Sequence, residues 1–70
     1  MFWWFEREGK LLRVEVLQLA ADHYELHVMQ PDEAERVETF SNADDLLKRQ
    51  VQLQHEMSDR GWSGPHGWVI

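Results

Sequence analysis

Residues 23–30 read His-Tyr-Glu-Leu-His-Val-Met-Gln, and this stretch decides the fold class because apolar and polar side chains alternate along it. In an extended chain, alternate side chains point to opposite faces. The apolar members on one face are Tyr24, Leu26 and Val28. The polar members on the other face are His23, Glu25 and His27. The pattern is typical of a strand that is buried on one side only.

The segments on either side of this strand have strand character too. We expect further strands over residues 2–7, 11–19 and 35–40, joined by short turns at residues 8–10, 20–22 and 31–34. The alternation slips at residues 17–19, where we expect a bulge or the end of the strand. Four consecutive strands joined by short turns most simply form an antiparallel meander.

The period of the sequence changes from strand to helix after residue 40. Either Ser41 or Asn42 is the expected N-cap, and Asp44 makes a variant of the capping box with Ser41. Asp44 and Asp45 then lie in the first turn, where the helix dipole favours negative charge. The sequence therefore predicts a helix that begins here and runs over residues 44–60.

One face of this helix is expected to be buried. The positions at i, i+3, i+4 and i+7 spacing form an apolar stripe with two interruptions: Ala43, Leu46, Leu47, Gln50, Leu53, Gln54 and Met57. Gly61 is the expected left-handed stop, and Trp62 is expected to pack back on Met57 as in a Schellman motif. At 1.5 Å per residue the helix is about 26 Å long, which matches strands of about eight residues at 3.3 Å each.

These elements predict an α+β fold. It is a four-stranded antiparallel meander with one C-terminal helix packed on one face (ββββα), followed by a short Gly/Pro/Trp tail over residues 61–70. The strand residues expected under the helix are Leu12, Val14, Val16, Tyr24, Leu26, Val28 and Val37. A chain of this length forms one domain at most, so residues 1–70 are expected to be a single small domain.

Composition limits the classes of partner. The 70 residues include 13 acids, seven Lys or Arg and no cysteine, for a net charge of −6. Disulfides and thiolate zinc sites are therefore excluded. The basic residues are scattered among acids, so we do not expect a nucleic acid or an anionic membrane surface as the main partner. No apolar run approaches the roughly 20 residues of a membrane span, and we expect a soluble, cytoplasmic protein.

Residues that could carry chemistry are few. On the open face of the sheet, Glu25 could share a metal with either His23 or His27, but two ligands do not make a zinc site. We expect instead a solvated face of opposite charges, with Arg13, Glu15, Arg36 and Glu38 as neighbours on adjacent strands. No nucleophile–base pair, phosphate-binding loop or metalloprotease motif is present. We therefore expect no enzymatic activity, no cofactor and no metal.

Aromatic residues gather at the two ends of the chain. Phe2 and Trp4 face one side of the first strand, while Trp3 and Phe5 face the other. One small helix cannot cover both sides, so two interpretations stay open. Either the tail folds back in the monomer, with Trp68, Val69 and Ile70 over Phe2 or Trp4, or the aromatic residues form a surface for a partner. The residues expected on that interaction surface are Phe2, Trp4, Trp62, Trp68 and Ile70.

The sequence thus predicts a small interaction module, self-associating through its first strand as an edge and through its tail. The partner is a second copy or another, unidentified protein, because a core of this size often needs the extra burial. The alternative is a domain that binds single-stranded nucleic acid on the open face. Its layout of four strands and a helix is similar to that of the Whirly family of single-strand binders, in element order only. The acidic net charge opposes this alternative.

Overall fold

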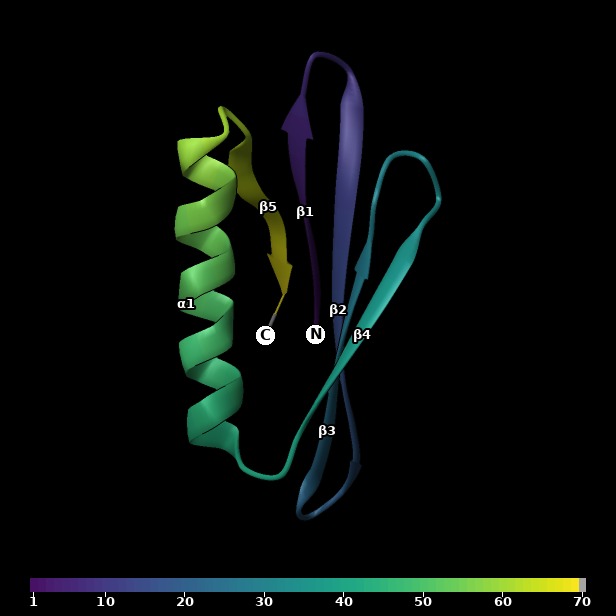
Figure 1. The fold of residues 1–70 in the computed structure, drawn as a ribbon, viewed down its shortest axis with the longest axis vertical. Helices are drawn as coiled ribbons and strands as arrows, with labels where there is room; N and C mark the ends of the chain where they lie inside the picture. The colour runs from purple at the N-terminus through teal and green to yellow at the C-terminus, as the bar shows by residue number, and fades with distance from the viewer. Residues whose placement is uncertain (70) are drawn as a thin grey trace.

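The computed structural model describes the backbone of residues 1–69 and the side chains of residues 1–67. It contains one helix and five strands (Figure 1). In chain order these are β1 (Phe2–Arg7), β2 (Lys10–Ala20), β3 (His23–Met29), β4 (Glu35–Phe40), α1 (Ala43–Asp59) and β5 (Ser63–Val69). The helix packs on one face of the sheet, so the fold is a two-layer α+β domain.

The sheet is open and antiparallel, with the strand order β4-β3-β2-β1-β5. The predicted meander of β1 to β4 and the single helix are confirmed. The tail, predicted as an appendage, instead adds a fifth strand that pairs with β1. The first strand is therefore interior, and the prediction that it forms an edge is wrong. The four-strand layout on which the resemblance to single-strand binders rests is likewise incomplete.

The pairing of β5 with β1 is irregular, which explains why the sequence conceals it. The paired positions are Phe2 with residue 69, Trp4 with His66, and Glu6 with Ser63. From one pair to the next, β1 advances by two residues and β5 by three, so β5 has an extra residue in each interval. Such bulges destroy the period of two by which a strand is recognised. Gly64 and Gly67 supply backbone angles with positive φ, at +132° and +66°, that other residues rarely adopt.

The core lies between α1 and the covered face of the sheet. Its buried side chains are Trp3, Phe5, Leu12, Val14, Leu26 and Val28 from the strands and Leu46, Leu53 and Met57 from the helix. The expected alternation on β1, β2 and β3 is thus confirmed. On β4 it is wrong, because Val37 lies opposite His27 on the open face and is 49% exposed. The expected bulge near residues 17–19 appears as a register shift between Gln18 and Ala20.

Both ends of α1 are capped by residues that the sequence suggested. Asn42, not Ser41, is the N-cap: its Oδ1 accepts a hydrogen bond of 2.8 Å from the Asp45 backbone N–H. At the other end, Gly61 has φ of +84°. The Trp62 N–H donates to the Met57 carbonyl at 2.9 Å, and the Gly61 N–H donates to the Ser58 carbonyl at 3.1 Å. These two bonds are those of the predicted Schellman motif.

Candidate functional site

The open face of the sheet, on the side away from α1, carries the first group of candidate residues. Phe2 and Trp4 both lie there, with their ring centroids 6.1 Å apart. His66 of β5 lies beside Trp4, at 6.1 Å between ring centroids. Phe2 is 39% exposed, whereas Trp4 is half-buried against β5. The structure therefore brings together two of the five residues expected on an interaction surface.

Trp62 lies elsewhere. Its side chain packs against the core on the helix side of the sheet, and the guanidinium of Arg7 stacks over its ring at 4.9 Å from the centroid. The structure does not join it to Phe2 and Trp4. The remaining predicted residues are Trp68, whose side chain lies outside the described residues, and Ile70, which lies outside them altogether.

A cluster of histidines and glutamates occupies the open face of β3. The His27 ring lies between two carboxylates, with Nδ1 2.7 Å from Oε1 of Glu35 and Nε2 3.0 Å from Oε1 of Glu25. The hydrogen bond with Glu35 and then that with Glu25 raise the pKa of His27. His23 approaches the same Glu25 at 3.7 Å. Within residues 1–67, no three His, Asp or Glu side chains converge in the manner of a metal site.

The expected neighbours of this cluster need correction on β4. Arg36 and Glu38 lie on the covered face, not on the open face, because Val37 and Thr39 are the residues opposite His27 and Glu25. Glu38 instead reaches the helix, where its two oxygens accept hydrogen bonds of 2.8 and 3.2 Å from Nε and Nη2 of Arg49. These bonds raise the pKa of Arg49 and join β4 to α1.

The two edges of the sheet differ in what they offer to another chain. β5 carries Pro65, which has no N–H, and two register shifts, features that blunt an edge strand. β4 pairs with β3 in an unbroken register over its whole length. Among residues 1–69, no strand pairs with the outer edge of β4, and no backbone hydrogen bond to another element covers it. β4 is therefore the regular, available edge.

Comparisons with known proteins add no assignment: no family model matches, and neither a curated protein nor a solved structure shows significant similarity. In the part of the chain that the structure describes, α1 is neither long nor apolar enough to cross a bilayer.

Proposed function

We propose that this protein is a small interaction module that pairs with a second copy of itself along the edge of β4. The observation that carries the proposal is the regular edge, with an exposed valine at its centre. An edge of this kind presents a row of backbone donors and acceptors to another strand. Pairing of two such edges would join two five-stranded sheets into one, with a twofold axis between them.

The sequence of β4 is complementary to itself in the antiparallel sense. When Val37 lies opposite Val37 of a second copy, Arg36 lies opposite Glu38 of that copy, and Glu38 opposite its Arg36. Opposite charges in cross-strand pairs are favourable, and the paired valines bury apolar surface on the open face. This register satisfies charge and hydrophobicity together, which supports a second copy as the occupant of the edge.

Sedimentation equilibrium over a wide concentration range tests the proposal. Wild-type protein is expected to rise in mass from 8.4 kDa toward twice that value. Val37→Lys is expected to hold the protein at the monomer mass, because an edge lysine opposes strand pairing. Val51→Lys is the matched control, since Val51 is 45% exposed on α1 and its substitution should leave the association unchanged.

The surface predicted from the sequence is tested in the same experiment. Phe2→Ser is the cleaner probe of the open-face aromatic residues, because Trp4 also packs on β5. If Phe2→Ser is monomeric while Val37→Lys remains a dimer, pairing at β4 is contradicted. The dimer interface then lies at the open-face aromatic residues. A wild-type protein that stays at the monomer mass throughout would overturn self-association itself.

The open face carries the aromatic side chains Phe2 and Trp4, on which bases could stack, but its charge opposes the nucleic-acid alternative. A strand of nucleic acid on the open face would lie near four acidic residues, Glu6, Glu15, Glu25 and Glu35, with Arg13 as the basic residue among them. The phosphates of that strand would be repelled rather than neutralised.

A further inference from the structure

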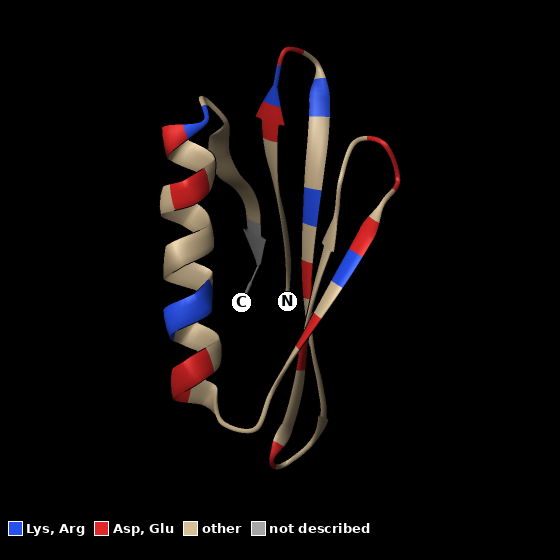
Figure 2. Cartoon of the chain, in the orientation of Figure 1, with Lys and Arg blue, Asp and Glu red and all other residues tan. Residues whose placement is uncertain are grey.

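A pocket opens between α1 and the covered face of the sheet at the end where the helix stops. It has a volume of about 220 Å³ and an apolar floor formed by Leu12, Val28, Leu53, Met57 and Trp62. Four of the chain's five arginines line it: Arg7, Arg36, Arg49 and Arg60. They come from β1, β4, α1 and the helix C-cap, so the chain brings together residues that are far apart in the sequence. Figure 2 shows bands of Lys or Arg on β1, β2, β4 and α1, with bands of Asp or Glu among them.

The charges of these arginines are not all balanced. Glu38 and Glu56, the two acids that line the pocket, both bond to Arg49, and Glu38 lies 3.6 Å from Arg36. Within the described residues, neither Arg7 nor Arg60 has a carboxylate at ion-pair distance. Four arginines and two glutamates leave the lining at +2, in a protein whose net charge is −6.

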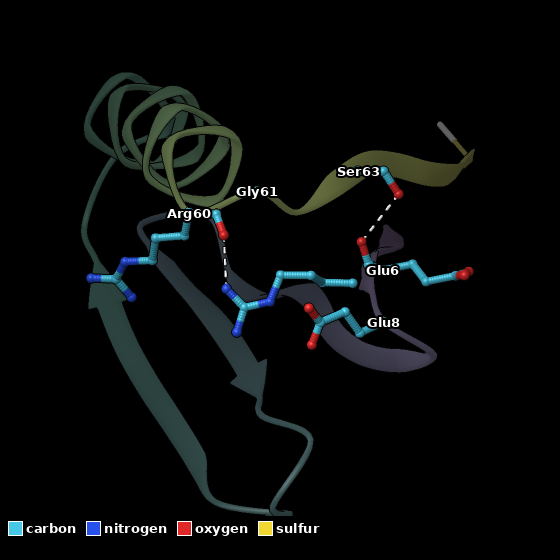
Figure 3. Close-up of a pocket in the computed structure, with 6 residues that line it drawn as sticks. Glu6, Glu8, Arg60, Gly61 and Ser63 are labelled. Atoms are coloured by element: carbon cyan, nitrogen blue, oxygen red, sulfur yellow. Dashed lines mark hydrogen bonds between the residues drawn. The ribbon is translucent and has the colours of Figure 1, made fainter.

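The two guanidinium groups without an ion pair differ in their surroundings. Arg7 Nη1 donates a hydrogen bond of 2.7 Å to the Arg60 carbonyl, and the Arg7 guanidinium also stacks on Trp62. Figure 3 shows this bond in a second, neighbouring pocket, where Ser63 Oγ donates to the Glu6 carbonyl. In the same view the side chain of Arg60 extends away from Glu8 and Ser63. Arg7 is thus held by two contacts, whereas the exposed side chain of Arg60 makes no hydrogen bond within the described residues.

We propose that this pocket binds a small organic carboxylate with a compact apolar body. Guanidinium groups bind carboxylates through paired, charge-assisted hydrogen bonds, and the apolar floor provides a surface for the body of the ligand. The volume is below the roughly 300–1,000 Å³ of pockets for drug-sized ligands, which favours a single ring or a short chain. The lining has a net charge of only +2 and includes two glutamates. A ligand with one negative charge is therefore favoured over a phosphate monoester, which carries two.

An NMR titration with phenylacetate as the probe tests this inference. Addition of phenylacetate is expected to shift the Trp62 indole N–H and the amide N–H signals of residues 28–30 and 57–62 saturably. Phenylacetamide has the same shape without the charge, and it should bind at least about fivefold more weakly. Inorganic phosphate, the second control, should give no saturable shift at constant ionic strength.

Arginine variants locate the site. Arg60→Gln is expected to weaken phenylacetate binding about five- to tenfold. Arg13→Gln is the matched control, because it removes the same charge from the fifth arginine, on the open face, and it should leave the affinity unchanged. Equal affinity for acid and amide, equal effects of the two variants, or no saturable shift would each overturn the proposal. Since Arg60 is not on β4, these outcomes are independent of self-association.

Discussion

Gly67 lies directly beneath the indole ring of Trp4, so close that a Cβ at residue 67 would overlap the ring atoms Cζ3 and Cη2. This contact joins the irregular strand β5 to β1 at the point where Trp4 lies opposite His66. Glycine is required here for two reasons, since its φ of +66° is also a conformation that other residues rarely adopt.

Gly67→Ala is therefore expected to lower the free energy of unfolding by about 2–4 kcal/mol, from the strained φ and from overpacking against Trp4. Gly9→Ala is the matched control. Gly9 has a similar φ of +77°, but no atom lies within 4 Å of a Cβ placed there. Gly9→Ala should lower the free energy of unfolding by about 1 kcal/mol, because only the strained φ contributes there. Urea denaturation measures both, and equal losses would show that Trp4 does not press on residue 67.

The N-cap of α1 gives a second prediction. Asn42→Ala removes the side chain that accepts from the Asp45 N–H, and it should cost about 1 kcal/mol of stability. Ser41→Ala serves as the control, because the capping bond comes from Asn42. The two variants compared by thermal unfolding decide between the caps that the sequence left open. A larger loss for Ser41→Ala would contradict the structure.

The stability of the sheet should depend on the protonation of His27. Its folded-state pKa is raised, so the imidazolium is favoured by folding. The stabilisation is therefore fully present below the unfolded value of about 6.5, and it is lost as the pH rises through the folded-state pKa. The charged groups near His27 on the open face are Glu25 on β3, Glu35 on β4, and Glu15 and Arg13 on β2.

Thermal unfolding between pH 5 and pH 8 measures this dependence. Glu35→Gln removes the strongest partner of His27, so the variant should lose less stability than the wild type as the pH rises. His55→Gln, at an exposed position of α1, should follow the wild-type profile. A Glu35→Gln profile parallel to the wild type would show that the ion pair contributes no pH dependence.

The regular elements could be predicted from the sequence because each is set by local patterns. The alternation over residues 23–29 gives β3, and Gly61 with Trp62 gives the end of α1. On β4 the expected faces are exchanged, since a strand of six residues with mixed polarity does not fix which face is buried. Glu38 can point toward the helix because Arg49 meets it there, a contact between residues 11 apart that no local pattern contains.

The candidate sites were less predictable for a related reason. β5 contains Gly64, Pro65 and Gly67, which are typical of a loop. It forms a strand because it pairs with β1 and because Gly67 packs against the Trp4 ring. The pocket arginines follow no sequence pattern, and the fold alone places them around one floor. The alternation of β1 predicts the two faces of its aromatic side chains correctly, but it does not show that β5 makes β1 an interior strand.

The proposed register at β4 predicts a pairing that depends on charge. In a homodimer, Arg36→Glu sets two acids opposite each other, and Glu38→Arg sets two bases opposite each other, so each variant should be monomeric. An equimolar mixture of the two chains should dimerise, because both pairs between positions 36 and 38 then join an acid and a base. Sedimentation velocity measures this, with circular dichroism as the control for folding. A mixture no heavier than its components would exclude the register.

An isotope-filtered NOE spectrum of mixed labelled and unlabelled chains detects whether two copies meet at β4. We expect intermolecular contacts only among residues 35–39, with Val37 close to Val37 of the second copy. Pairing at β4 is contradicted if the intermolecular contacts come from Phe2 and Trp4 instead. It is also contradicted if no intermolecular contact is seen at a concentration where the mass is that of a dimer.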